Sequence, residues 1–298
     1  MVGISTALMT KKGNAKAEEI FEFCEKCGIR HLELDIHVTR DLLREMIPKL
    51  KKGEFKPITL HNFCPLPDNI PPHKASGDAF NLASLDLEEQ REGVKWSLKT
   101  IETACELEAQ SVILHLGFIS EFNEAPQKFF EENFREKLLP DFLKWREEKV
   151  KKHLDALFRA LEVLLKRAEL LGVKIGIENR YYPHEIPLGE EIGLILKEFE
   201  GAPVFYWHDT GHAHVLEKLG LLDQKGLLKI YGSKMIGLHL HDANGFKDHL
   251  PPGKGEIRFN ELKGLLPQEA IRILEIHPPC EEDELKEALN SLRRNELI

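Results

Sequence analysis

The sequence has no long hydrophobic run and few cysteines. No apolar stretch approaches the roughly 18 residues that a membrane-spanning helix requires, so we expect no contact with a membrane. The 5 cysteines cannot all pair, and their scattered positions are typical of reduced thiols. The first residues lack the charged region and apolar stretch of a signal peptide. Together these absences predict a cytoplasmic protein.

The sequence also lacks an excess of positive charge. It has 41 Lys and Arg against 50 Asp and Glu, which gives a formal net charge of -9. An acidic chain has no general attraction for nucleic acid or anionic membranes. We therefore expect a small molecule as the partner rather than nucleic acid. The composition leaves the oligomeric state open and is compatible with a homo-oligomer.

Neither a linker rich in Pro, Gly or Ser nor a low-complexity segment divides the chain, so we expect a single domain, 1–298. Strands that alternate with helices form right-handed βαβ units, and eight such units close a (β/α)8 TIM barrel, an α/β fold. Residues 117–150 are longer than an ordinary connection and predict a helical insertion after strand four. The eight candidate strands are the apolar runs 3–8, 31–36, 57–62, 111–116, 173–179, 203–209, 235–241 and 270–277.

Polar residues recur at alternate positions near the carboxyl ends of these strands. Because side chains alternate between the two faces of a strand, the apolar set should face the helices and the polar set the barrel interior. The carboxyl ends form the face where barrel enzymes place their sites. The strand in 203–209 is the least regular, since Asp209 shares its face with Phe205 and Trp207. The inward polar residues are Glu33, Asp35, His61, His115, Glu178, Asp209, His239, His241, Glu275 and His277.

Four of these residues predict a metal site. Glu178, Asp209, His239 and Glu275 would place three carboxylates and one imidazole around a single point. Crowded carboxylates repel one another at low dielectric unless a cation compensates them. A divalent metal is the simplest explanation, and a hydrogen-bonded polar plug without metal is the alternative.

Four further histidines extend this prediction. His61 and His115, from strands three and four, would add imidazoles beside the central group and create a second metal position. His212 follows the aspartate of strand six by three residues, and His249 lies on a loop that can fold over the mouth. Both are candidate substrate-binding residues or ligands of a third metal, although each is also compatible with a surface histidine.

At these residues the chain resembles the xylose isomerase-like TIM barrel superfamily, which includes sugar isomerases and epimerases, inosose dehydratases and AP endonucleases of the endonuclease IV type. The order and spacing of the motifs on successive strands carry the resemblance. The motifs are LHN at 60–62, LHLG at 114–117, IENR at 177–180, HDTGH at 208–212, HLHD at 239–242, DHLPPG at 248–253 and LEI at 274–276.

The resemblance implies a catalytic metal held by Glu178, Asp209, His239 and Glu275. In the epimerases of the superfamily, the two glutamates also exchange the proton beside the carbonyl, and His212 would contact substrate. The resemblance also implies that His61 and His115 would carry a second zinc in the nuclease branch, sharing Glu178.

In that nuclease branch, His212 and a loop Asp-x-His pair would carry a third zinc. Here Lys247 stands where the loop aspartate would be, so we expect the third position to lack a ligand. The N-terminus also lacks the nuclease opening of a His and paired glycines. Both departures make DNA cleavage the weaker interpretation.

The first functional hypothesis is a divalent-metal-dependent isomerase or epimerase of a sugar or sugar phosphate. Glu178 and Glu275 would take and return the proton beside a carbonyl, and the metal would stabilise the enediolate. Zinc or manganese is the expected metal, with cobalt or magnesium as alternatives. The second hypothesis is an endonuclease IV-like zinc phosphodiesterase or hydrolase. The third is a regulator that binds sugar or metal without turnover.

Several residues near the mouth are candidates for lesser roles. Arg180 and Lys254, together with Tyr181 and His184, are candidates to contact substrate hydroxyls or a phosphate. Trp207 and Phe63 would supply an apolar wall. Cys64 is a candidate soft ligand, with a buried apolar role as the alternative.

Overall fold

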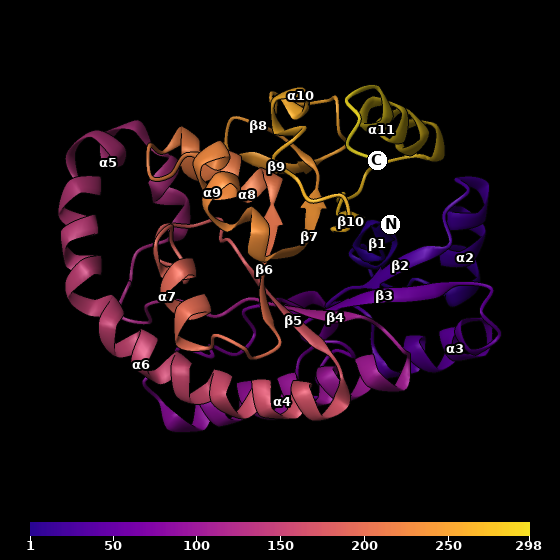
Figure 1. Cartoon of the computed structure of the whole chain (residues 1–298), viewed down its shortest axis with the longest axis horizontal. Coiled ribbons are helices and arrows are strands. Elements are labelled where there is room, and N and C mark those ends of the chain that lie inside the picture. The colour runs from indigo at the N-terminus through magenta and orange to yellow at the C-terminus, as the bar shows by residue number, and fades with distance from the viewer.

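The computed structural model describes the backbone of residues 1–298 and every side chain except that of Lys137. Eight parallel strands form a closed barrel, with the short strands β8 (Asp242–Asn244) and β9 (Lys247–Leu250) outside it (Figure 1). The predicted single barrel is therefore confirmed. Around the barrel the strands are β1 (Val2–Ser5), β2 (His31–Leu34), β3 (Lys56–His61), β4 (Ser111–Leu114), β5 (Lys174–Glu178), β6 (Val204–Asp209), β7 (Met235–Leu240) and β10 (Ile271–Leu274).

Helices surround the barrel, and α4 and α6 lie side by side along one flank (Figure 1). No helix in the described part of the chain is long and apolar enough to cross a membrane. The helices are α1 (Ala7–Thr10), α2 (Ala17–Lys26), α3 (Arg40–Lys51), α4 (Leu87–Glu106), α5 (Glu132–Lys137), α6 (Leu139–Leu171), α7 (Glu191–Glu198), α8 (Thr210–Lys218), α9 (Gln224–Tyr231), α10 (Phe259–Leu262) and α11 (Glu282–Arg294), with the 3-10 turns η1 (Pro72–Lys74), η2 (Pro126–Phe130) and η3 (Gly232–Lys234).

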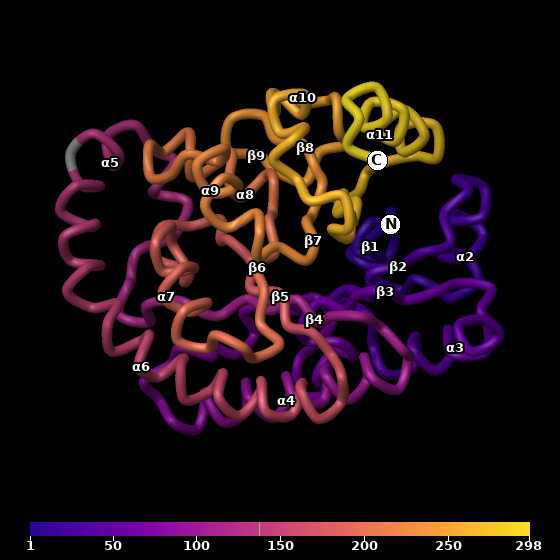
Figure 2. Tube along the Cα trace, viewed as in Figure 1, coloured from indigo at the N-terminus to yellow at the C-terminus, as the bar shows by residue number. Residues whose placement is uncertain are grey.

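Residues 117–150 comprise η2, α5 and the start of α6, which continues without a break to Leu171. Helix α6 begins at Leu139, because Pro140 favours the first turn and no Gly or Pro interrupts residues 141–171. Figure 2 shows α5 and the start of α6 at the outer left edge of the chain trace. The helix ends where Gly172 adopts a left-handed φ of 68°, as its position in the sequence predicts.

The barrel interior below the carboxyl ends is filled. Ile58, Ile113, Trp207 and Ile273 form one buried cluster, and residues of non-adjacent strands can meet in this way only inside the barrel. Gly237 makes room for the Trp207 ring, since a Cβ there would lie 2.2 Å from the indole. The mouth therefore has a closed apolar floor, on which the polar side chains of the carboxyl ends stand.

Candidate metal centre

Four of the predicted ligands meet at the carboxyl ends of β5, β6, β7 and β10. One potential ligand atom from each of Glu178, Asp209, His239 and Glu275 lies within 4.8 Å of the other three. Nδ1 of His239 is 2.9 Å from Glu178 Oε1, 3.1 Å from Glu275 Oε2 and 3.6 Å from Asp209 Oδ2. Glu275 is 7% exposed and the other three are fully buried. Barrel closure thus produces the expected group of three carboxylates around one imidazole.

The donor set of this central group fits a divalent cation. Nε2 of His239 lies 3.1 Å from both carboxylate oxygens of Glu33, so Nε2 donates its proton to Glu33 and Nδ1, on the side of the three carboxylates, would be the nitrogen that binds a cation. Ligands at about 2.0–2.1 Å from a tetrahedral ion lie roughly 3.3 Å apart, which is close to the spacing here. A carboxylate behind a ligating histidine is the usual second partner of a metal-bound imidazole.

The charges of the central group favour ionised carboxylates. Burial alone would raise the pKa of Glu178, but His239, His115 and His61 around it lower that pKa well below its usual value. Burial likewise opposes the charged form of His239, whereas Glu275, Glu33 and Glu178 raise its pKa well above its usual value. The group therefore holds concentrated negative charge that calls for a cation.

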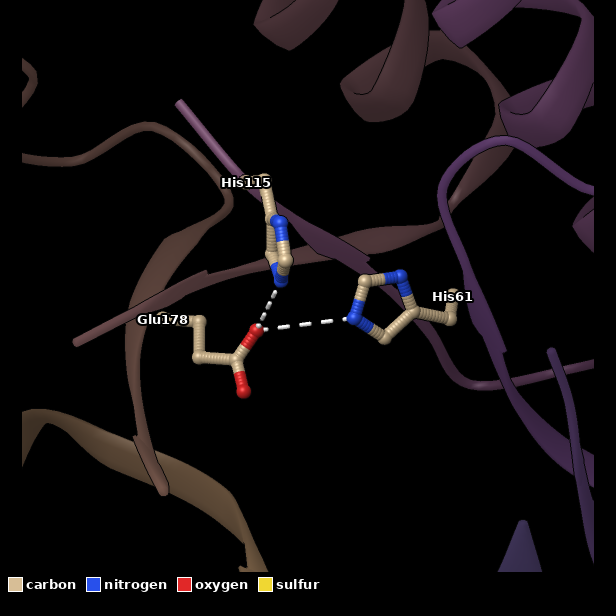
Figure 3. Close-up of side chains that lie close together, drawn as sticks. All are labelled: His61, His115 and Glu178. Carbon is tan, nitrogen blue, oxygen red and sulfur yellow. Dashed lines mark ion pairs between the residues drawn. The ribbon is translucent and has the colours of Figure 1, made fainter. Parts of the chain in front are cut away.

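His61 and His115 point at the same oxygen of Glu178 (Figure 3). The Nε2 atoms lie 3.5 Å and 3.0 Å from Glu178 Oε2. Nδ1 of His61 donates to the carbonyl of Asn62 at 3.1 Å, which leaves Nε2 free to bind a cation. Nδ1 of His115 lies 2.9 Å from Asp78 Oδ2. This second group has the composition and orientation that a two-imidazole, one-carboxylate metal position requires.

Arg180 lies behind this second group rather than at the mouth. It is 2% exposed and donates to Asp78 at 2.6 Å and to Glu185 at 2.9 Å. Arg180 therefore holds Asp78, which in turn holds His115. Burial and Arg180 disfavour protonation of His115, but Asp78 and Glu178 outweigh them and raise its pKa to about 9. A substrate contact by Arg180 stays a prediction, and the observed contacts assign it a positioning role.

A third group contains His212, Asp248 and His249. Asp248 Oδ2 lies 3.7 Å from His212 Nε2 and 3.0 Å from His249 Nδ1. Our expectation that Lys247 would leave this position without its acidic ligand was wrong, because the next residue along β9 supplies the carboxylate. The unpredicted hairpin of β8 and β9 turns Asp248 and His249 toward the mouth, and His249 adopts a left-handed φ of 56° there.

The loop after β9 is fixed by Asp242. The carboxylate of Asp242 accepts hydrogen bonds from the backbone N–H groups of Gly253, Gly255 and Ile257 at 2.9–3.0 Å. A Cβ at Gly255 would lie 2.2 Å from a backbone oxygen, so only glycine fits. This arrangement explains the Pro-Pro-Gly-x-Gly pattern structurally. Lys254 is exposed on this loop and does not line the metal cavity, so the structure does not bring this candidate to the site.

A cavity of about 240 Å³ opens above the three groups. Its lining does not include Trp207 or Phe63, which are buried, so neither forms the expected apolar wall. Cys64 belongs to the apolar core, as the alternative interpretation held. Tyr181 packs edge-on against His212 and donates its hydroxyl to the carbonyl of Phe246. The cavity is lined by Ala7, Lys11, Asp35, Ile36, His37, His61, Ala75, Ser76, Gly77, His115, His212, His249, Glu275 and His277.

Four residues that lie at the site had no predicted role: Glu33, Asp78, Lys11 and His37. The alternation of side chains along β2 predicted that Glu33 points into the barrel, but it did not predict the contact with His239. Asp78 lies on a long non-periodic connection between β3 and α4, where no repeating pattern marks which side chain turns inward. Lys11 follows the one-turn helix α1 and has no motif around it.

The fold is shared with proteins of known structure. A family model described as a xylose isomerase-like TIM barrel matches residues 21–295. The uncharacterized protein MJ1311 of Methanocaldococcus jannaschii is 29% identical over 61% of this chain and 55% of its own length. The match therefore spans about half of that relative.

Solved structures of the same fold include sugar epimerases. D-psicose 3-epimerase from Clostridium cellulolyticum, solved with D-tagatose, has a TM-score of 0.70 at 16% identity and covers 98% of both chains. The IolI protein, solved with a zinc atom, has a TM-score of 0.64 at 18% identity and covers 99% of this chain and 96% of its own. From the family match over most of its length, the chain belongs to the xylose isomerase-like TIM barrel family.

Proposed function

We propose that this chain is a divalent-metal-dependent isomerase or epimerase of a small sugar or sugar derivative. The observation that carries the proposal is the central group, in which Glu178 and Glu275 stand beside Asp209 and His239 at the barrel mouth. Glu275 lines the cavity, so a substrate carbon above it is within reach of a carboxylate. The fold likeness to sugar epimerases and to a zinc-binding protein supports the same reading.

The chemistry follows from two carboxylates on different strands. One carboxylate removes the proton from the carbon next to the substrate carbonyl, and the electron pair of that C–H bond moves toward the carbonyl oxygen. The other returns a proton, to the opposite face for an epimer or to the neighbouring carbon for an isomer. A bound divalent cation would supply the positive charge that stabilises the oxygen anion. Glu178, Asp209, His239 and Glu275 would hold that cation.

The test replaces each proton-transferring carboxylate with its neutral isostere. Glu178→Gln and Glu275→Gln should each lower the incorporation of solvent deuterium into substrate by about 100-fold or more, since positioned acid–base groups contribute on this scale. A panel of ketoses, aldoses and their phosphates is incubated with zinc-, manganese-, cobalt- or magnesium-loaded protein in D₂O and followed by NMR.

Metal content is measured on every variant, so that loss of proton transfer is separated from loss of the cation. Glu162→Gln, which changes an exposed glutamate on α6, serves as the matched control and should retain full exchange. Full exchange in either active-site variant that still binds metal would overturn the assignment of that glutamate.

A metal-dependent phosphodiesterase is the second candidate, and a specific observation favours it. His61 and His115 cover the Oε2 atom of Glu178, and Asp248 completes a third group with His212 and His249. Proton transfer beside one cation requires none of these five extra side chains. Two or three neighbouring cations are instead typical of phosphate ester hydrolysis.

The two candidates differ in the number of ions and in the reaction. The isomerase reading expects one tightly held ion per chain and solvent exchange into a sugar. The hydrolase reading expects two or three zinc ions per chain, by elemental analysis of protein purified without chelator, and cleavage of a chromogenic phosphodiester. Hydrolysis that is lost in His115→Ala, together with absent sugar exchange, would replace the first candidate by the second.

A further inference from the structure

A second cavity adjoins the metal cavity, and its titratable lining residues are all Lys or His. It has a volume of about 390 Å³ and shares Lys11 and His37 with the metal cavity. Lys12 and His73 add two more basic side chains, and none of its described lining residues is Asp or Glu. Acidic residues outnumber basic ones in the chain, 50 to 41, so this composition sets the cavity apart from the protein surface as a whole.

Lys11 lies at the junction of the two cavities, and among the residues that the structure describes its ammonium group hydrogen-bonds to His277 alone. Its Nζ lies 2.9 Å from Nδ1 of His277, the polar partner that the structure gives it. An ammonium group only donates, so the imidazole nitrogen accepts and the remaining N–H bonds of Lys11 are free for a ligand. The His277 ring stacks on His249 with centroids 3.6 Å apart, which fixes this acceptor in place.

His37 is anchored from below. Its Nδ1 lies 2.5 Å from Oδ2 of Asp35, which is buried. Oδ1 of Asp35 accepts hydrogen bonds from the hydroxyls of Thr6 and Thr10 at 2.8 Å each. The ring of His37 is therefore held in one orientation between the two cavities. The hydroxyls of Thr6 and Thr10 donate to the other oxygen of the Asp35 carboxylate.

We propose that the second cavity binds the phosphate group of a phosphorylated substrate, whose reacting carbons lie in the adjoining metal cavity. The inference rests on the proposed isomerase or epimerase function and names its substrate class, a sugar phosphate. Lys11 and His37 would contact the phosphate at the junction, and Lys12 and His73 at the outer wall. A dianion requires several cationic donors around it, which a neutral sugar does not. A hydrolysed phosphodiester, by contrast, would place its phosphate among the metal ligands.

The experiment measures binding of inorganic phosphate to the metal-loaded full-length protein by calorimetry. Lys11→Ala should weaken phosphate binding by about 10-fold or more, because hydrogen bonds to charged groups contribute on this scale. Lys11→Gln, which keeps the length of the side chain without its charge, should weaken binding similarly. Lys51→Ala is the matched control, since Lys51 is exposed in the last turn of α3 and lines neither cavity.

A second readout compares solvent exchange into a sugar phosphate and into the corresponding free sugar. Lys11→Ala should raise KM for the phosphate ester by a larger factor than KM for the free sugar, because only the ester carries the dianion that Lys11 would contact. Phosphate binding that depends on Lys11 without any exchange would uphold the anion site while the proposed function fails. Phosphate affinity that is the same in Lys11→Ala and in the unmodified protein would overturn the anion site, whether or not the chain turns over sugars.

Discussion

At the scale of the residue, four histidines of the centre are each oriented by a partner on the nitrogen that faces away from the candidate metal position. His61 uses the carbonyl of Asn62, His115 uses Asp78, His212 uses the carbonyl of Asn179 and His239 uses Glu33. Such partners fix the tautomer and the ring plane, so that the second nitrogen faces the ligand position. The remaining nitrogens of His61, His115 and His239 face Glu178, and that of His212 faces Asp248.

Glu33 makes the sharpest prediction at this scale. Glu33→Gln keeps the size of the side chain but removes the negative charge behind His239. Because a carboxylate partner strengthens the ligating nitrogen, the affinity for zinc or manganese should fall by about 10-fold or more. Competition against a chromogenic chelator measures this affinity directly, without any substrate.

The control for Glu33→Gln is a substitution of Asp35, a buried carboxylate that directly follows β2. Asp35→Asn should leave the metal affinity unchanged, because Asp35 bonds to Thr6, Thr10 and His37 and to none of the proposed ligands. Equal metal affinities for Glu33→Gln and the unmodified chain would rule out the positioning role.

At the scale of the element, α6 ties the segment before it to the rim of the barrel. Arg146 is buried, bonds to the carboxylate of Glu191 and donates to the carbonyls of Pro183 and Glu185. These residues follow β5, and Glu185 also bonds to Arg180. Because Arg180 donates to Asp78, which contacts His115, α6 supports the loop that positions both residues. Phe129, Phe134 and Phe142 pack against α8 residues to complete this contact.

A second contact of α6 predicts that the stability of the fold depends on pH. Nε2 of the buried His153 lies 2.5 Å from Glu121, and Lys152 also bonds to that carboxylate. Burial would raise the pKa of Glu121, but its bonds to Lys152 and His153 lower it to about 2. A lowered folded-state pKa contributes stability above the unfolded value of about 4.3, and that stability is lost as pH falls toward 2.

Urea unfolding of the unmodified chain and of Glu121→Gln checks this expectation. The difference in unfolding free energy should be about 1 kcal/mol at pH 6, because Glu121 is 33% exposed and solvent screens the pair. It should shrink steadily as the pH is lowered to 3. A difference that stays constant from pH 6 to pH 3 would contradict the ion pair.

At the scale of the whole molecule, closure of the barrel creates the centre. The pairing of β1 with both β2 and β10 completes the ring of strands and brings Glu33 against His239, 206 residues away in the sequence. The acidic groups that contribute to the net charge of -9 are thus concentrated in part at one mouth. The adjoining cavity beside Lys11 and His37 places positive charge next to them. An acidic group of side chains and a basic cavity therefore lie next to each other at this end of the barrel.

Strand alternation in the sequence was sufficient to predict the barrel and the residues of the central group. It succeeded for Glu178, His239 and Glu275 because a parallel strand buried on both sides must place its polar residues inward near its carboxyl end. Residues on connections carry no such period. For this reason the positions of Asp78, Arg180 and Lys254 were not predictable.

The order of strands and helices and the donor types at each strand end follow from the sequence alone, because periodicity and residue chemistry are local properties. Three outcomes required the tertiary structure: which candidate ligands lie together, that Asp248 rather than Lys247 lies beside His212 and His249, and that Lys11 contacts His277. Those outcomes depend on loop paths and on closure of the barrel, which bring together side chains from opposite ends of the chain.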